Sequence, residues 1–349
     1  MLAKTSSSRD GDYNVRAMKP IAVTLGDPAG IGTEVVFKAL AEIDQKMPIW
    51  VFGDWRFAQQ MLQQIAFETP IHRVFSLEEA KIQPGNLLFI DVRKSEAQQL
   101  RYGTIDALYG SIALASIDLA LDAIHQGLCT ALVTAPLNKQ AIAAAGSSFR
   151  GHTELLASKN KLEKYGRDFA MYFDSPSLRV VLLTVHVPLS QALQHIDPDM
   201  IVDLAALTER DFMKLYKKKP RIGVAGVNPH AGEGGMMGTE EKVIAEAVHR
   251  AAANGHTISG PFAPDTIFLS ARQGKFDVVM AIYHDQGLIP VKTVHFDQSV
   301  NITLGLPYLR ASVDHGTAFD IAGKGIANHN PMRYAIGWTA KHAEDFFQK

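Results

Sequence analysis

The sequence predicts an α/β fold with a largely parallel sheet, and two observations support this. Short apolar runs rich in β-branched residues recur along the 349 residues, and longer stretches with helical periodicity separate them. Gly and Pro bound these runs, as is typical of buried strands in repeated β–α units. Because 47% of the residues are hydrophobic and only 20% are charged, the chain has ample material for a large core.

Six strands and two helices can be assigned in order along the chain. The length suggests about two domains. No linker-like stretch interrupts the pattern, so the sequence favours two domains that share a cleft over two domains joined only by a linker. The strands are expected at 21–25, 87–90, 131–134, 180–185, 222–227 and 278–283, and apolar stripes predict helices over 112–126 and 200–216.

Charge and cysteine content argue against several classes of protein. A formal net charge of −1 gives no electrostatic reason for binding nucleic acid or an anionic membrane surface. The single cysteine, Cys129, lies in an apolar stretch and cannot form an internal disulfide, which fits a reducing compartment. No apolar run approaches the roughly 20 residues that span a bilayer. Residues 1–17 lack the apolar segment of a secretory signal, so we expect a disordered tail and a cytoplasmic protein.

A glycine-rich turn follows the first expected strand. Its sequence, Gly-Asp-Pro-Ala-Gly-Ile-Gly over residues 26–32, leads into a helix expected to begin near Thr33. Amides at a helix N-terminus can bind an anionic group, but a turn of this composition is structural at least as often. The spacing differs from the GxGxxG dinucleotide fingerprint, so it does not support a Rossmann cofactor site.

Three histidines stand at the ends of separate expected strands. His186 and His284 directly follow or end the runs 180–185 and 278–283, and His230 comes shortly after 222–227. Each alone could be an ordinary hydrogen-bonded histidine. In open α/β sheets, however, ligands bind outside the carboxyl ends of the strands. Three imidazoles converging there, with further positions open, would form a catalytic metal site.

The chemistry of these side chains narrows the choice of metal and its role. Imidazole ligands suit Zn²⁺, Co²⁺ or Ni²⁺ better than Mg²⁺. Asp265 and Asp285 could orient the ligands, although Asp265 could equally cap a helix. A metal ion bound to a substrate hydroxyl lowers its pKa and favours the alkoxide from which a hydride leaves. It would also stabilise the electron density left when a β-keto acid loses CO₂.

Further polar residues near strand ends are candidate handles for an anion. Arg suits phosphate or carboxylate through bidentate hydrogen bonds, whereas Lys acts as a point charge. The segment Thr-Ala-Pro-Leu-Asn-Lys at 134–139 ends another strand and has no clear role. The candidate anion-binding residues are His152, Thr153, Lys292, Asn301 and Arg310.

Six motifs occur in order along the chain. They are the turn at 26–32, Gly-His-Thr-Glu at 151–154, Asn-Pro-His-Ala-Gly-Glu at 228–233, Tyr-His-Asp-Gln-Gly at 283–287, Val-Asn-Ile-Thr-Leu-Gly-Leu-Pro at 300–307 and Asp-His-Gly-Thr-Ala at 314–318. Taken together, they resemble the 4-hydroxythreonine-4-phosphate dehydrogenase family, from about Lys19 to the C-terminal region. The resemblance implies a fold like that of isocitrate and isopropylmalate dehydrogenases, with two α/β/α domains around a cleft. These domains would comprise approximately 18–145 plus 305–349, and 146–304.

The resemblance also implies a reaction and a site. The family oxidises 4-phosphooxy-L-threonine with NAD or NADP and a divalent metal (Zn, Co or Mg), and the product decarboxylates to 3-amino-2-oxopropyl phosphate, a precursor of pyridoxal 5′-phosphate. It works as a homodimer with its active site at the subunit interface, where one metal ligand comes from the partner. Carried over by motif, the metal ligands are His186, His230 and His284, and the substrate contacts are His152, Thr153, Lys292, Asn301 and Arg310.

Two alternatives stay open from the sequence. The opening turn has Gly-Asp-Pro where some family members have Gly-Glu-Pro. Related branches act on D-threonate or D-erythronate 4-phosphate, or on aromatic dihydrodiols, and share most of the motifs, so the motifs define the reaction type better than the substrate. A non-catalytic protein that binds metal or phosphate on this fold is the third reading. The general base and the cofactor-binding residues are not identified.

Overall fold

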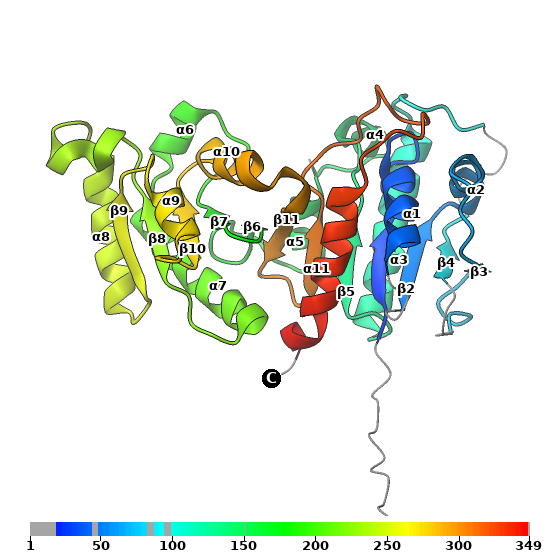
Figure 1. The fold of residues 1–349 in the computed structure, drawn as a ribbon, viewed down its shortest axis with the longest axis horizontal. Coiled ribbons are helices and arrows are strands. Elements are labelled where there is room, and N and C mark those ends of the chain that lie inside the picture. Colours follow the sequence, from blue (N-terminus) through cyan, green and yellow to red (C-terminus); the bar gives the residue numbers. More distant parts are fainter. Residues whose placement is uncertain (1–18, 44–47, 82–86, 94–98, 150, 348–349) are drawn as a thin grey trace, which may run out of the picture.

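The computed structural model describes residues 19–43, 48–81, 87–93, 99–149 and 151–347. The tail expected at 1–17 lies outside the described residues. A single sheet of 12 strands crosses the whole molecule, in the order β3-β4-β2-β1-β5-β12-β11-β6-β7-β10-β8-β9 (Figure 1). The strands are β1 Ile21–Thr24, β2 Ile49–Gly53, β3 Ile71–Val74, β4 Leu87–Asp91, β5 Ala131–Thr134, β6 Ala170–Asp174, β7 Arg179–Leu182, β8 Ile222–Ala225, β9 Ile258–Phe262, β10 Val278–Ala281, β11 Val300–Leu304 and β12 Leu309–Ser312.

The predicted α/β class with a largely parallel sheet is confirmed. All six expected strands exist, although several end two or three residues earlier than predicted, because the apolar run continues into the turn that follows. The middle of the sheet was not foreseen. There β11 runs antiparallel to β12 and β6, and β6 runs antiparallel to β7, so strand direction reverses between the two halves.

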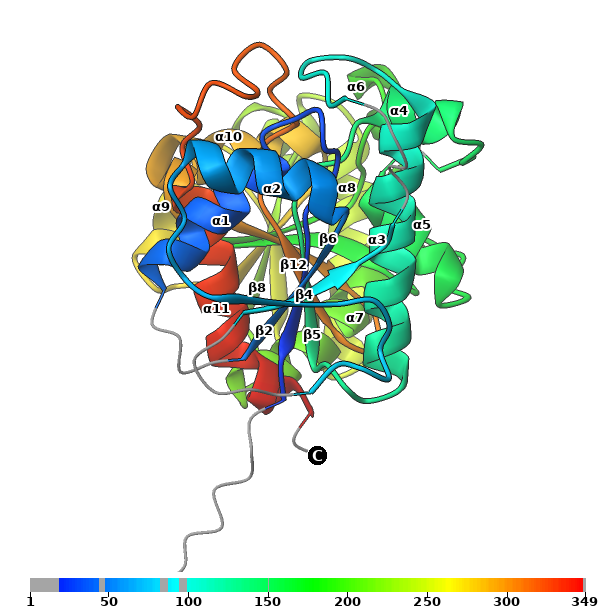
Figure 2. The ribbon, with the colours of Figure 1, turned by 90° about the vertical axis from the view of Figure 1, so that its right-hand side faces the viewer.

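Helices cover both faces of the sheet. On one face α1, α11, α7 and α8 pack in a row, and α11 lies over the centre (Figures 1 and 2). The other face carries α3 and α4 over one half and α10 over the other. The helices are α1 Gly32–Glu42, α2 Trp55–Gln64, α3 Ala107–His125, α4 Lys139–Ala144, α5 His152–Lys159, α6 Leu189–Gln194, α7 Pro198–Tyr216, α8 Glu240–Ala253, α9 Ile267–Arg272, α10 His284–His295 and α11 Asn330–Phe347, with short 3₁₀ turns η1 Pro229–Gly235 and η2 Phe296–Gln298.

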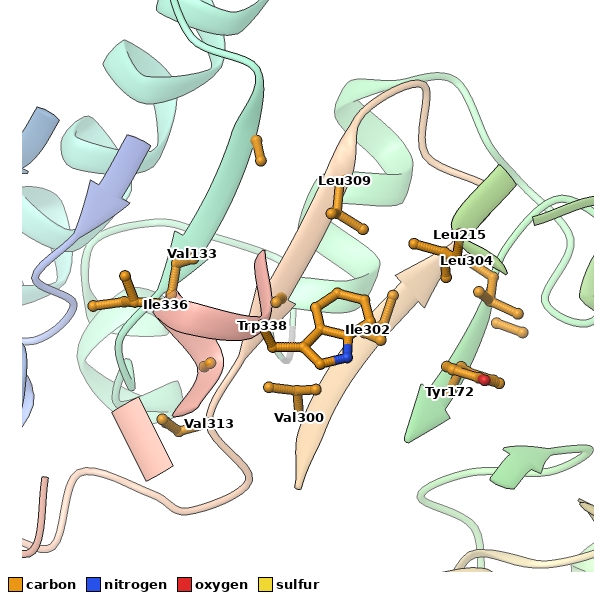
Figure 3. Close-up of a cluster of buried hydrophobic side chains, with 14 of the residues drawn as sticks. Val133, Tyr172, Leu215, Val300, Ile302, Leu304, Leu309, Val313, Ile336 and Trp338 are labelled. Carbon is orange, nitrogen blue, oxygen red and sulfur yellow. The ribbon is translucent and has the colours of Figure 1, made fainter. Parts of the chain in front are cut away.

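The core follows the two-residue period of the strands. On β1, Ile21 and Val23 belong to the cluster under α1 and α11, whereas Ala22 belongs to the cluster under α3. This alternation buries both faces, as expected for a parallel sheet between helical layers. Figure 3 shows the central part of the first cluster, where Trp338 of α11 packs beside Ile302 of β11. On the face under α11, the antiparallel centre is therefore apolar like the parallel parts.

One described helix, α3, is long and apolar enough to cross a membrane by length and composition. Half of that window is buried, however, and α3 packs on β1, β2, β5 and α4. Its apolar character is explained by its place in the core. Cys129 follows this helix and is 3% exposed, and burial raises the pKa of its thiol well above the usual range, so it is a packing residue, as predicted.

Candidate active site

A cavity of about 340 Å³ lies where the two halves of the sheet meet. Its volume is within the range of small-molecule sites. It collects residues that are far apart in the sequence, from the ends of β5 and β12, the start of α5, and the turns after β7 and β10. Of the predicted site residues, His152, Thr153, His186, His284, Asn301 and Arg310 line it.

Arg310 on β12 is the most deeply buried charge in this cavity. Its side chain is 2% exposed. Nη2 donates to Thr134 Oγ1 at 2.7 Å and Nη1 donates to Thr303 Oγ1 at 3.1 Å. Burial lowers the pKa of Arg310 to about 10, which leaves the guanidinium charged at neutral pH. Because its hydrogen-bond partners are neutral hydroxyls, the positive charge is not neutralised by a bonded carboxylate, and such a charge is costly to bury.

Several polar atoms around Arg310 also have no hydrogen-bond partner among the described residues. They are Arg310 Nε, His152 Nε2, Asn301 Oδ1 and His315 Nε2, and all four are buried. Buried polar groups are normally paired, so each unpaired group needs an explanation. Burial, and secondly the Arg310 charge, lower the pKa of His152 well below its ordinary value, so its ring is neutral. A ligand with several acceptor oxygens would pair with Arg310 Nε and with a ring N–H of either histidine, whereas Asn301 Oδ1 needs a donor.

Lys292 of α10 reaches the edge of the cavity through an ion pair. Its Nζ lies 3.0 Å from Asp314 Oδ2, and Asp314 lines the cavity. Burial raises the pKa of Asp314, while Lys292 opposes the shift. Lys292 is not itself among the lining residues, so in this structure it borders the cavity rather than entering it.

His186 and His284 stand together at one side of the cavity, with ring centroids 5.6 Å apart. His284 is the first residue of α10, and its Nδ1 lies 2.7 Å from Asp285 Oδ1. An Nδ1–H donated to this carboxylate would leave Nε2 free to bind a metal. His186 Nδ1 lies 3.9 Å from Glu154 Oε1. His186 is the main influence lowering the pKa of Glu154, and Lys139 adds to it.

His230 is placed differently from the other two histidines. It lies in η1 and is not among the residues that line the cavity. Residues 230–234 all have left-handed backbone angles, which carries the segment out as an exposed arm that we call the His230 arm (residues 229–238). Glu241 anchors its base, since Oε1 accepts hydrogen bonds from the amides of Val227 and Asn228 at 2.9 and 2.6 Å.

The arrangement fits a metal ion in part. Two imidazoles of the same cavity are close enough to share one ion, and Asp285 supports His284 in the way that carboxylates support metal-binding histidines. Among the described residues of one chain, however, no set of three or more His, Cys, Asp or Glu side chains is arranged to hold a metal. The alternative role of Asp265 as a helix cap is wrong, because Thr266 is the N-cap residue of α9.

The glycine-rich turn at 26–32 is a structural turn. Its amides are already used: the N–H groups of Asp27 and Ile31 donate to the carbonyls of Pro136 and Thr317 at 2.9 and 3.0 Å. A side chain at Gly30 would lie 2.8 Å from Thr317. The turn therefore joins two loops beside the cavity and presents no free cradle for the phosphates of a dinucleotide.

Comparison with known proteins places this geometry in a family. Residues 44–339 match the family of the pyridoxal phosphate biosynthetic protein PdxA. A 4-hydroxythreonine-4-phosphate dehydrogenase of Beijerinckia indica is 41% identical over 323 residues, which cover 92% of this chain and 94% of that protein. The chain belongs to the PdxA family.

Other relatives carry a second name. A D-threonate 4-phosphate dehydrogenase of Salmonella typhimurium is 38% identical over 321 residues, covering 91% of this chain and 97% of that protein. The crystal structure of a 4-hydroxythreonine-4-phosphate dehydrogenase from Klebsiella pneumoniae superposes with a TM-score of 0.84 at 39% identity, covering 93% and 99% of the two chains. The PdxA fold and an oxidoreductase activity are thus shared by relatives with two different substrates.

The PdxA-family cavity contains residues that the sequence did not single out as site residues. Ser312 and Asp314 line it, and so do Thr134 and Lys139 from the segment of unclear role at 134–139. The polar residues that end and follow the strand at 131–134 were the signal in the sequence that could have identified Thr134 and Lys139 as site residues. A larger cavity of about 830 Å³ borders α11 and β6. Its Arg179 and Arg333 are already paired with Asp174 and Glu42, at 3.1 Å each, so the chemistry favours the smaller cavity.

Proposed function

We propose that this PdxA-family oxidoreductase oxidises the 3-hydroxyl of 4-phosphooxy-L-threonine with NAD⁺ or NADP⁺ and a divalent metal, as a step of vitamin B6 biosynthesis. One observation carries the proposal: a buried arginine without a bonded carboxylate and a pair of neighbouring imidazoles share one small cavity. The first suits a phosphate and the second suits a metal-bound hydroxyl. A phosphorylated hydroxy acid needs both.

The phosphate is assigned to the inner end of the cavity. Arg310, the hydroxyls of Thr134, Thr303 and Ser312, and the amide of Asn301 gather there, and all five side chains are less than 10% exposed. A phosphate dianion offers several acceptor oxygens and would neutralise the guanidinium. It would also satisfy donors that are now unpaired, which offsets part of the cost of keeping Arg310 charged and buried. His152 and Thr153 close this end, and Lys292 approaches it from α10.

The metal is assigned to His186 and His284, with His230 supplied by a second copy of the chain. His230 lies on the exposed arm outside the cavity, as expected for a ligand that reaches into a neighbouring subunit. Large apolar side chains are exposed near His186 and His284, notably Leu189 at 54% and Ile289 at 64%, and Met236 on the His230 arm is 78% exposed. Covering these side chains in a subunit interface would remove apolar surface from water, which favours association. We therefore propose a homodimer.

In this scheme the protein positions the substrate, and the metal, when bound, acidifies the 3-hydroxyl and stabilises the electron density of the new carbonyl. Arg310 and its hydroxyl partners hold the phosphate, so C3 is fixed between the two ends of the cavity. Asp285 would keep the His284 ring in the orientation that a ligand needs. The oxidised nicotinamide, when bound, would take the hydride from C3 while the 3-hydroxyl gives up its proton to solvent. The resulting β-keto acid would lose its C1 carboxylate as CO₂ and gain a proton at C2, giving 3-amino-2-oxopropyl phosphate.

The wider context of the enzyme is also proposed. We place the two domains at approximately 18–145 plus 305–349, and 146–304, because the cavity lies where the two halves of the sheet meet. A cytoplasmic location agrees with the single buried thiol. The formal net charge of −1 agrees with a small-molecule enzyme that binds neither nucleic acid nor a membrane.

A second substrate, D-threonate 4-phosphate, is favoured by one specific observation. Relatives with that name match the chain over similar lengths and at similar identity, 38% against 41%. This compound has the same phosphate, 3-hydroxyl and carboxylate, and differs by a hydroxyl in place of the 2-amino group. The same cavity would therefore bind it through the same inner contacts.

The test is a direct assay of the purified full chain. NADH or NADPH formation would be followed with 4-phosphooxy-L-threonine and with D-threonate 4-phosphate, at equal concentrations and with Zn²⁺, Co²⁺, Mn²⁺ or Mg²⁺. A higher kcat/KM for the amino acid supports the main proposal. Faster turnover of the sugar acid would replace it by the second, and absence of turnover with either compound under all metals would refute both.

A further inference from the structure

The phosphate and metal contacts leave the amino-acid end of the proposed substrate without partners. That end carries a carboxylate at C1 and an ammonium group at C2. Both are charged, so a specific enzyme needs an opposite charge for each. Among the described residues that line the cavity, three charged side chains have no part in the phosphate or metal contacts. Asp314 is already paired with Lys292, which leaves Lys139 and Glu154.

Lys139 is the second cation of the cavity lining, beside Arg310. It is the first residue of α4, and the Asn138 side chain caps this helix by accepting from the amides of Gln140 and Ala141 at 2.9 and 3.0 Å. The cap fixes the backbone at Lys139 beside the cavity. No hydrogen bond or ion pair to another described residue holds its ammonium group. Lys292, in contrast, is paired with Asp314 at 3.0 Å.

Glu154 supplies the matching anion. It follows His152 and Thr153 in the first turn of α5, and its carboxylate lies on the side of His186. Its Oε1 is 3.9 Å from His186 Nδ1, beyond hydrogen-bond range, and the side chain is 40% exposed. Because His186 lies at this distance, the Glu154 carboxylate can still accept a hydrogen bond from a ligand in the cavity.

We infer that Lys139 binds the C1 carboxylate and Glu154 binds the C2 ammonium group, so that this pair selects a phosphorylated amino acid over the matching sugar acid. The inference rests on the proposed function. Lys139 serves both substrates, because both have the carboxylate. Glu154 separates them, because an ammonium group makes a charge-assisted bond with a carboxylate whereas a hydroxyl makes a weaker, neutral-donor bond.

The experiment measures binding and turnover of both compounds by wild type, Glu154→Gln and Lys139→Met. Titration calorimetry on the metal-loaded full chain gives affinities that do not depend on activity. Wild type is expected to bind 4-phosphooxy-L-threonine more tightly than D-threonate 4-phosphate. Glu154→Gln should lower the affinity for the amino acid about tenfold and the affinity for the sugar acid less than about twofold. Lys139→Met should lower the affinity for both compounds about tenfold. Glu163→Gln and Lys159→Met, on exposed positions nearby, are the matched controls.

Each contrary result has a distinct meaning. If Glu154→Gln weakened the binding of both compounds equally, Glu154 would act only through His186. In that case the amount of bound metal, measured in the same samples, would also change. Unchanged affinities in Lys139→Met would overturn the carboxylate assignment. Binding without turnover by wild type would refute the proposed oxidation while the binding comparison still decides the inference. No binding of either compound would overturn both.

Discussion

The ring centroids of His186 and His284 lie 5.6 Å apart, although the two residues belong to different β–α connections. Their proximity follows from the sheet, because β7 and β10 are hydrogen-bonded parallel neighbours and each histidine follows the end of its strand. His230 follows β8, which pairs with the other side of β10. The left-handed run at 230–234 nevertheless carries His230 onto an exposed arm. The strands thus account for the neighbouring pair of imidazoles, and the arm accounts for the position of His230 outside the cavity.

Mixing two inactive variants tests whether the metal site is shared between subunits. His230→Ala and His284→Ala should each abolish turnover with the fold retained, because loss of a ligand removes metal-dependent stabilisation of the alkoxide. Co-refolding equal amounts should restore activity to about a quarter of wild type, since half of the dimers are mixed and each has one intact site. Circular dichroism and metal content check the single variants. A mixture as inactive as its components would place all ligands in one chain.

Replacing Arg310 should separate binding from stability. Arg310→Met removes a buried charge whose bonded partners are neutral, so the free energy of unfolding should fall by no more than about 1 kcal/mol. Substrate binding should weaken by about 2–5 kcal/mol, because the phosphate loses its buried partner. Denaturant unfolding and KM measure the two effects. Arg250→Met, on the exposed face of α8, is the control, and an unchanged KM in Arg310→Met would contradict the phosphate assignment.

Asp27 should make the protein less stable at neutral pH than at mildly acidic pH. Burial is the main cause that raises its pKa from 3.8 to about 6, and its Oδ2 has no hydrogen-bond partner among the described residues. A raised carboxyl pKa stabilises the fold below pH 4, and the contribution is lost as pH rises through about 6. Asp27→Asn should therefore raise the free energy of unfolding above pH 7 by roughly 2 kcal/mol.

The difference between wild type and Asp27→Asn, measured by denaturant unfolding from pH 4 to pH 8, isolates this residue. Burial also raises the pKa of Asp174 to about 6. Because Asp174 is present in both proteins, its contribution cancels in the difference between their free energies of unfolding. A difference that does not grow between pH 4 and pH 7 would show that the Asp27 carboxyl is not held protonated by the fold.

Gly26 should tolerate no side chain. It has a left-handed φ of +70°, and a Cβ atom there would lie 2.1 Å from the carbonyl oxygen of Pro136. Gly146 is the matched control, because its φ is +90° but nothing lies within 4 Å. Gly146→Ala should cost about 1–2 kcal/mol, the backbone penalty alone. Gly26→Ala should cost more and lower activity, since Pro136 lines the cavity. Equal losses of stability in the two variants would refute the steric argument.

The sequence alone determined the α/β class, the six strands it assigned, the buried cysteine and six of the residues that line the cavity. These features depend on local periodicity and on motifs, and both are present in a one-dimensional chain. The sequence analysis missed the antiparallel centre of the sheet, since β6 and β11 pair across long separations that no local pattern records. It also left 134–139 without a role, because the hydrogen bond from Arg310 to Thr134 exists only once β12 lies beside β5.

Tertiary structure decided which of the predicted residues meet. It joined His186 to His284 through strand pairing, left His230 on an arm, and buried Arg310 among hydroxyls. It also showed that the glycine turn at 26–32 uses its amides internally, which the composition left open. The physical reason is the same in each case. The sequence specifies the chemistry of each side chain directly. The distance between two side chains depends on strand register, strand direction and backbone angles along the chain between them.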